Sequence, residues 1–191
     1  DADRFKPLVE IATASSASLD AALKAAESEP PSLEKVRLLT ILSTNAQYVR
    51  VPVDWDLAEQ YARRALEMAE KLDSALALST ALGTLGELYF NRGLWRELVQ
   101  VCLRRLALSR DVRFSDMHER VSALIDTGQA LIRVGEYAQA IPYLLEGESL
   151  AGQMQDAIME RYALDERILC LFRLDRWDDI LNLEDKLRDM Q

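Results

Sequence analysis

The chain has 191 residues, of which 49% are hydrophobic and 29% charged, which is the composition of a folded protein with a core and excludes a disordered or fibrous one. It contains 32 Leu and 24 Ala against 10 Val and 8 Ile, with only 7 Gly and 5 Pro, so helices are favoured over a large β-sheet. The net charge of −9 would repel a phosphate backbone, and we expect this segment to contact no nucleic acid.

Helix-forming segments succeed one another along the whole chain. Residues 3–14 and 18–27 form a short first pair that we expect to cap the later helices. Residues typical of helix starts, Ser32, Asp54 and either Ser115 or Asp116, then introduce longer helices. The expected helix pairs are 32–50 and 54–72, 74–92 and 94–109, 116–134 and 137–151, and 157–174 and 176–190. We therefore predict an all-α chain of helical hairpins.

The hairpins recur with a regular period. Aromatic residues separated by 40, 42 and 40 residues mark the same place in each, namely Trp55, Trp95, Tyr137 and Trp177. Gly93 and Gly135 stand two residues before two of them and indicate a tight, left-handed turn between the helices, and Asp175 takes this place in the last unit. Gly86 and Gly128 lie within helices, where glycine is unfavourable unless a neighbouring helix approaches closely.

This pattern resembles the tetratricopeptide repeat (TPR). The residues of one unit that match the family pattern in order are Leu82, Leu85, Gly86, Tyr89, Gly93 and Trp95. Arg105 and Gly147 depart from the family's second-helix pattern, and the period of 40–42 exceeds the usual 34. Such a long period is similar to that of the TPR-like domains of bacterial signal-transduction regulators.

The resemblance implies an all-α, right-handed α-α superhelix, that is, a TPR-like solenoid. We expect a single solenoid over residues 1–191, with a helical cap at 1–31 and repeats at about 32–73, 74–114, 115–154 and 155–191, and we expect it to be a piece of a longer protein. The residues expected to define the repeat by packing between helices are Trp55, Gly86, Tyr89, Trp95, Gly128, Tyr137 and Trp177.

By analogy with the family, the first helices of the hairpins line a concave binding surface. The candidate groove residues are Gln47, Arg50, Glu87, Phe90, Asn91, Gln129, Arg133, Asp165, Phe172 and Arg173. Tyr162 and Leu169 also fall on exposed first-helix positions. Arg50, Arg133 and Arg173 recur near the ends of first helices, so we expect a partly cationic row that holds a carboxylate-bearing segment of a partner. A groove that is only solvated, or filled by the parent protein, stays open as an alternative.

The sequence offers little for catalysis. His118 is the single histidine, and Cys102 and Cys170 lie 68 residues apart in apolar helical patterns, where we expect buried thiols. We find no set of residues for a metal, a cofactor or a catalytic site, and we predict that the chain is not an enzyme. The longest uncharged stretch, residues 74–86, is too short to span a bilayer, so we expect no membrane contact and a cytoplasmic location.

We therefore expect a non-catalytic scaffold for protein–protein or peptide interactions, within a larger signalling or transcription-regulating protein. One alternative is a sensor domain for a small ligand or a signal peptide. A second alternative is a structural spacer or oligomerisation arm. Whether the chain forms homo-oligomers stays open.

Overall fold

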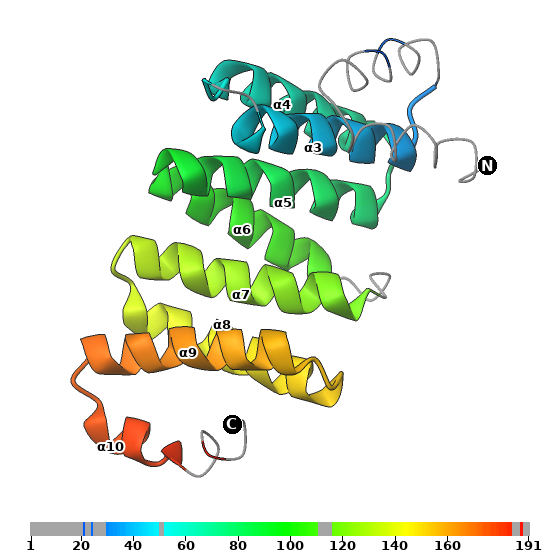
Figure 1. Cartoon of the computed structure of the whole chain (residues 1–191). Coiled ribbons are helices and arrows are strands. Elements are labelled where there is room, and N and C mark those ends of the chain that lie inside the picture. The colour runs from blue at the N-terminus through cyan, green and yellow to red at the C-terminus, as the bar shows by residue number, and fades with distance from the viewer. Residues whose placement is uncertain are drawn as a thin grey trace. The chain divides into compact units, whose positions relative to one another are not determined.

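The computed structural model describes residues 21, 24, 30–49, 52–110, 116–184 and 188. Over these residues the chain is helical and contains no strand, which confirms the all-α prediction (Figure 1). The expected helices 3–14 and 18–27, and most of the expected cap at 1–31, lie outside the described residues.

Eight helices succeed one another in chain order. They are α3 (Leu33–Tyr48), α4 (Trp55–Lys71), α5 (Ala75–Arg92), α6 (Trp95–Ser109), α7 (Met117–Arg133), α8 (Tyr137–Gln153), α9 (Ala157–Arg173) and α10 (Trp177–Leu181) within the described part of the chain. The first seven agree with the expected ranges to within two residues at each end. The expectation of one helix over 176–190 is wrong, because Asn182 and Leu183 form a turn that ends α10.

Local chemistry explains where the helices begin. The side chains of Ser32, Asp54 and Ser74 accept hydrogen bonds from backbone N–H groups three residues further on, at 3.2, 3.0 and 3.3 Å. Asp116 and Asp156 do the same for α7 and α9, each at 3.1 Å. These bonds satisfy N–H groups that have no partner inside the helix. Of the two start residues proposed for α7, Asp116 is the cap.

The turns within hairpins are left-handed, as the glycines predict. Gly93 and Gly135 have φ values of 70° and 84°, a region in which a side chain is unfavourable. Asp175 adopts φ 54° at the same place before α10. The aromatic residue of each unit is thereby placed at the first position of α6, α8 and α10.

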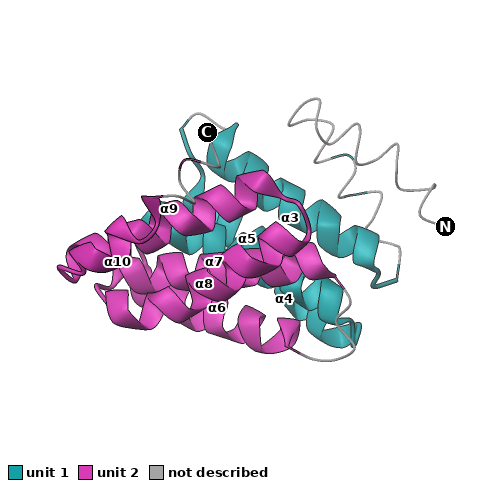
Figure 2. Ribbon diagram, turned by 90° about the horizontal axis from the view of Figure 1, so that it is seen from below, with its two compact units in different colours: residues 1–93 teal, residues 94–191 magenta. Residues whose placement is uncertain are grey.

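The chain forms two compact units, Asp1–Gly93 (unit 1) and Leu94–Gln191 (unit 2), shown in different colours in Figure 2. In unit 1, α3 packs against α4 and α5, and α4 packs against α5. In unit 2, α7 packs against α6, α8 and α9, while α9 also contacts α8 and α10. The single solenoid over residues 1–191 stays a prediction.

The core of unit 1 combines branched side chains from α3 with alanines from α4 and α5. Its buried members are Val36, Leu38, Leu39, Leu42, Tyr61, Ala65, Ala69, Ala77 and Ala81. The alanines allow the helices to approach closely, and the branched side chains fill the space between them. Unit 2 uses smaller buried clusters, one of which joins Leu131, Ala140, Leu144 and Cys170.

The residues expected to define the repeat divide into two groups. Gly86, Tyr89 and Gly128 are buried. A Cβ atom at Gly128 would lie only 2.6 Å from Cγ of Leu144, so α7 and α8 approach each other closely at this point. The four aromatic markers are less enclosed: Trp55, Trp95 and Tyr137 are half-buried, and Trp177 is 52% exposed. The residues three positions further on, Ala58, Leu98 and Ala140, are buried instead.

Candidate functional site

The first helices of unit 1, α3 and α5, are joined by a polar network at their C-terminal ends. Asn91 Nδ2 donates to Gln47 Oε1 at 3.0 Å and to Tyr48 Oη at 2.6 Å, and Tyr48 Oη donates to Glu87 Oε1 at 3.0 Å. Burial and then the neighbouring Glu87 raise the pKa of Tyr48, while the bond from Asn91 acts in the opposite direction. Tyr48 is therefore a neutral phenol that can both donate and accept in this network.

This network corrects one candidate. Gln47 was expected to be an exposed groove residue, but it is only 3% exposed, because Asn91 covers its carbonyl and its own amide lies 3.5 Å from Ser43 Oγ. Glu87 and Asn91 are exposed, and Phe90 is half-buried. Arg50 lies outside the described residues.

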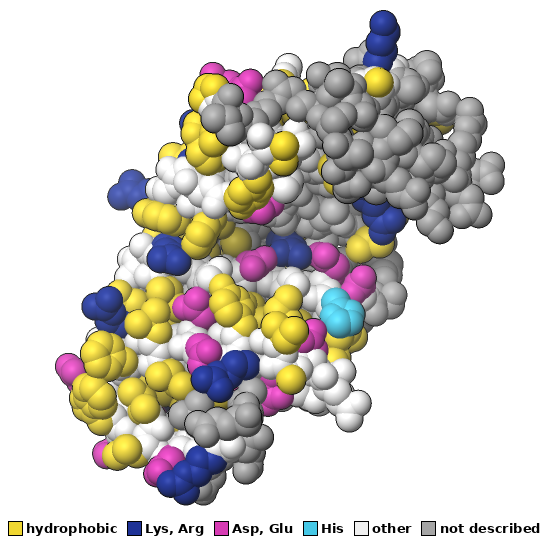
Figure 3. Space-filling model, in the orientation of Figure 1, with side chains coloured by type: hydrophobic (Ala, Val, Ile, Leu, Met, Phe, Trp, Pro, Cys, Tyr) yellow, Lys and Arg dark blue, Asp and Glu magenta, His cyan; other side chains and the backbone are white. Residues whose placement is uncertain are grey.

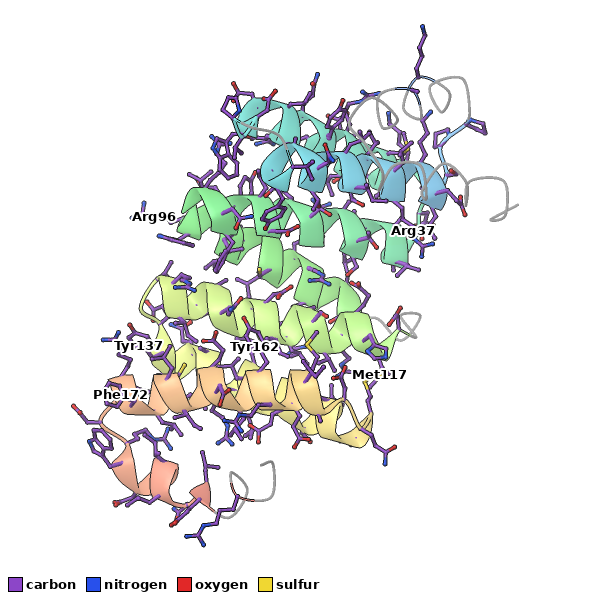
Figure 4. The ribbon with its side chains drawn as sticks, in the orientation of Figure 1. Arg37, Arg96, Met117, Tyr137, Tyr162 and Phe172 are labelled. Atoms are coloured by element: carbon purple, nitrogen blue, oxygen red, sulfur yellow. The ribbon has the colours of Figure 1, made fainter. Side chains whose placement is uncertain are left out.

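In unit 2 the first helices are α7 and α9, which contact each other (Figure 1). Gln129 Nε2 on α7 donates to Tyr162 Oη and, at 3.1 Å, to Glu166 Oε1 on α9. Figure 4 shows Tyr162 in the space between these two helices. Burial, followed by the charges of Glu166 and Asp126, raises the pKa of Tyr162. A neutral phenol and several carboxylates thus share this surface.

At the C-terminal end of α7, Arg133 lies over the ring of Trp95, with 5.8 Å between the guanidinium carbon and the ring centroid. This distance suits a cation–π interaction. Arg173 occupies the corresponding place on α9 and is exposed. The two arginines therefore bring positive charge to the same end of both first helices in unit 2.

The outward side of α9 carries a row of exposed apolar side chains, which we call the α9 row: Ile158, Tyr162, Leu169 and Phe172. Their exposed fractions range from 37% to 82%. Asp165 stands in the middle of the row, and Arg161 Nε donates to its Oδ1 at 3.0 Å. Figure 3 shows hydrophobic side chains interspersed with acidic ones over the face formed by α7 and α9.

The α9 row ends beside α10. The rings of Phe172 and Trp177 meet edge to face, with 5.2 Å between centroids and an angle of 87°. Figure 4 places Phe172 at the end of α9 that leads into α10. Both rings remain about half exposed, so this contact leaves apolar surface uncovered.

In unit 2, two buried charged side chains, Arg105 and Glu148, take part in ionic links between helices. Arg105 on α6 is 6% exposed and donates Nη2 to Glu119 Oε2 at 2.7 Å and Nη1 to Asp126, both on α7. Glu148 on α8 is 3% exposed and accepts from Arg167 Nε and Nη2 on α9, at 2.8 and 3.1 Å. Arg105 thus meets two carboxylates, and Arg167 forms a bidentate pair with Glu148, which satisfies buried charges that would be very unfavourable alone.

The candidate residues of unit 2 differ in their exposure. Gln129 is half-buried between α7 and α9, whereas Arg133, Asp165, Phe172 and Arg173 are exposed. Sequence reasoning did not single out Ile158, which starts the α9 row. The signal for it was present, since Ile158 precedes Tyr162 by four residues on the same helix.

The described residues also bear on metal sites, membrane spans, the two cysteines and the single histidine. The described residues contain no group of three or more His, Cys, Asp or Glu side chains that could hold a metal ion. Among the same residues, no helix combines the length and apolar character needed to cross a bilayer. Cys102 and Cys170 are buried free thiols, as expected. His118 is exposed, with its Nδ1 3.8 Å from Asp156 Oδ2.

Comparison with known proteins identifies the fold. No family model matches the sequence, and no curated protein matches it. Among solved structures, the chain is similar to a Signal Transduction ATPase with Numerous Domains (STAND) protein with a tetratricopeptide repeat sensor from Pyrococcus horikoshii, with a TM-score of 0.76 and 17% identity. The match covers 96% of this chain and 28% of that protein, so the chain spans under a third of its length.

Two further structures have the same architecture. The TPR-like repeats of a protein described as a kinesin light chain from Podosopora anserina match at a TM-score of 0.72 and 13% identity, over 100% of this chain and 91% of that one. BtubC from P. vanneervenii matches at a TM-score of 0.67 and 16% identity, over 87% of this chain and 71% of that one. The chain therefore has the fold of TPR-like solenoid proteins.

Proposed function

We propose that the chain is a non-catalytic protein-interaction module whose partner binds the surface formed by α7 and α9. The observation that carries this proposal is the α9 row, where four large apolar side chains are exposed on one helix beside the polar side chains of Gln129 and Glu166. Exposed apolar surface bordered by polar groups is typical of a protein-binding site.

The two arginines add a specific expectation for the partner. Arg133 and Arg173 lie at the same end of α7 and α9 in a protein whose net charge is −9. We expect them to hold a carboxylate of the partner, since a shielded charge-assisted hydrogen bond contributes about 1.5–3 kcal/mol. Replacing both by Ala should weaken binding more at low salt than at high salt. If the double variant and the natural chain bind the partner with equal affinity at both salt concentrations, this part of the proposal fails.

The similarity to a STAND protein suggests the setting. In that protein, TPR-like repeats are described as a sensor and form part of a much longer chain. We infer that this chain serves in the same way as the binding part of a larger regulator in the cytoplasm, and its two buried free thiols suit a reducing compartment.

A photo-crosslinking residue tests where the partner binds. Benzoylphenylalanine replaces Tyr162 in one variant and Leu145 in another, and both variants are expressed in cells of the source organism. Leu145 is the matched control, because it is an exposed apolar residue on α8 and not on a first helix. We expect protein adducts at position 162 and none at position 145. Adducts at position 145 alone, or at neither, would overturn the proposal.

A sensor for a small ligand is the second candidate, favoured by the sensor description of the similar STAND protein. A ligand that binds only the folded state raises the melting temperature, and the effect grows with the ratio of its concentration to its Kd. A metabolite panel that raises the melting temperature of the chain, with no crosslinked protein at position 162, would favour the sensor over the interaction module.

A further inference from the structure

The α9 row has the geometry of a helix–helix seam. Ile158, Tyr162, Asp165, Leu169 and Phe172 succeed one another at separations of four, three, four and three residues. This alternation keeps all five side chains on one side of a helix, as in the a and d positions of a coiled coil. At 1.5 Å per residue the row extends for about 21 Å. It is therefore a straight strip that matches a second helix better than a compact ligand.

Among the described residues, no second helix runs along this seam. Helix α9 contacts α7, α8 and α10, and its buried side chains, such as Ala163, Leu164 and Leu171, face those neighbours. Within the described part of the chain, α7 touches the row at Tyr162 and α10 touches it at Phe172, yet its four apolar members stay at least 37% exposed. In the described part of the chain, α9 therefore provides one of the two helices that a coiled-coil contact requires.

The charge in the middle of the row restricts what can cover it. Asp165 lies at the midpoint between Ile158 and Phe172, and a helix laid along the row would remove its carboxylate from water. Burying a carboxylate is very unfavourable unless a cation or several hydrogen-bond donors meet it. Arg161 Nε already donates to both oxygens of Asp165, at 3.0 and 3.1 Å, and we infer that the partner helix adds a second donor for this carboxylate.

The same carboxylate argues against a second copy of this chain as the occupant. Two copies of α9 paired about a two-fold axis through the middle of the row would place Asp165 against Asp165 of the other copy. Like charges that face each other across an interface are destabilising. A partner with a basic residue at this place avoids that repulsion.

We propose that the α9 row is the docking site for an amphipathic helix of a partner protein, with apolar side chains at a and d spacing and a single Lys or Arg that faces Asp165. This inference rests on the proposed function and deepens it, because it states the conformation and the charge pattern of the partner. Ile158, Leu169 and Phe172 provide the apolar contacts, and Tyr162 adds a ring on which a cationic side chain can lie.

Two displayed peptide libraries of equal length test the proposal against the full chain. The first has a helical heptad scaffold with randomised a, d and central positions, and the second has Pro at every third position, which enforces an extended conformation. Enriched peptides are synthesised, and their affinities are measured by fluorescence anisotropy for the natural chain and for Leu169→Glu, Leu145→Glu and Asp165→Lys. Leu145→Glu is the matched control, since it places the same charge on an exposed apolar residue outside the row.

We expect binders from the helical library with Lys or Arg at the centre. Leu169→Glu should weaken them by about tenfold or more, as for other central interface residues, while Leu145→Glu leaves them unchanged. Asp165→Lys should reverse the preference, so that peptides with a central Glu bind better than those with a central Lys.

Other outcomes overturn the inference in distinguishable ways. Binders from the extended library alone that depend on Leu169 would leave the proposed function standing and exclude a helical partner. If helical peptides bind Asp165→Lys with the same affinity as the natural chain, the proposed charge pattern of the partner is excluded. A dimer of the chain alone that dissociates in Leu169→Glu would identify a second copy as the occupant. If neither library yields a binder that depends on a residue of α7 or α9, both the inference and the proposed function fail.

Discussion

Helix α3 of unit 1 and helix α9 of unit 2 differ in how they bury the same place in the repeat. The residue directly after the mid-helix glycine position is Gln47 on α3, Glu87 on α5, Gln129 on α7 and Leu169 on α9. In unit 1, Gln47 is buried and bonded to Asn91, whereas in unit 2 Leu169 is exposed in the α9 row. Unit 2 meanwhile buries the charged side chains of Arg105 and Glu148. The hairpin fixes the backbone, and single side chains decide whether a first-helix position is buried or exposed.

The largest effect is expected from the buried charges of unit 2. Arg167→Met leaves Glu148, which is 3% exposed, without its bidentate partner. Breaking such a pair typically costs about 3–5 kcal/mol of unfolding free energy, which urea denaturation measures. Arg176→Met is the control, because its pair with Asp179 is half exposed, and we expect it to stay within about 0.5 kcal/mol.

A second variant separates the ion pair from simple loss of packing. In the double variant Glu148→Met and Arg167→Met, no unpaired charge remains, and most of the lost stability should return. A double variant as unstable as Arg167→Met alone would show that Glu148 was never the source of the loss, and would weaken the contrast between the units.

The next largest loss of stability is expected where α7 and α8 approach each other closely. In Gly128→Ala the new Cβ would lie 2.6 Å from Cγ of Leu144, which is fully buried and has to move. Overpacking of this kind destabilises by about 1–3 kcal/mol, which exceeds the gain of up to about 1 kcal/mol from replacing a helical glycine. Gly152→Ala is the control, since its Cβ would meet only the carboxylate end of Glu160. A higher melting temperature for Gly128→Ala than for the natural chain would contradict the packing of these helices.

A smaller effect on stability depends on pH and on Cys102, one of the two buried thiols of unit 2. Burial, and then the charge of Asp126, raises the pKa of Cys102 to about 12 from an ordinary value of 9.0. The folded state therefore keeps its proton while the unfolded state loses it, so stability is complete below about pH 9 and falls as the pH rises towards about 12. Between these two pH values the loss approaches about 1.4 kcal/mol per pH unit.

The variant Cys102→Ala isolates this contribution. The stability lost because the side chain is truncated does not change with pH. The comparison therefore uses only the slope of the unfolding free energy against pH. We expect the natural chain to lose more stability than the variant between about pH 8 and about pH 10. Parallel curves would show that the thiol is already accessible to solvent in the folded state.

The smallest effect compares the two glutamines directly. Gln47→Ala removes the acceptor of Asn91 in a buried setting and should cost about 1–2 kcal/mol, as for other buried hydrogen bonds. Gln129→Ala, whose partners Tyr162 and Glu166 can reach water, should cost about 0.5 kcal/mol or less. Equal thermal shifts for the two variants would mean that the units do not differ at this position.

The helices could be predicted because their signals are local. Ser32, Asp54 and Asp116 cap helices with bonds that reach only three residues, and Gly93 and Gly135 adopt their left-handed conformation within a single turn. A sequence displays such short-range chemistry directly. The fold class could be predicted because these signals repeat at a regular interval.

The site residues could be predicted only in part, because their surroundings depend on distant partners. Gln47 is buried by Asn91, which lies 44 residues further along the chain. Arg105 departs from the repeat pattern because Glu119 and Asp126 on the next helix neutralise it. The α9 row has the same spacing as a buried stripe, so periodicity alone does not reveal which side of α9 faces water.

The ionic link between α8 and α9 also bears on how such an array can grow. Repeat proteins lengthen when a hairpin is duplicated, and the period of the aromatic markers aligns Arg167 on α9 with Thr127 on α7. If the hairpin of α7 and α8 were copied in tandem, Glu148 of the first copy would face Thr127 of the second copy. Its buried carboxylate would then have no arginine with which to form an ion pair. Duplication of this hairpin would therefore be tolerated only after a basic residue had replaced Thr127 in the new copy.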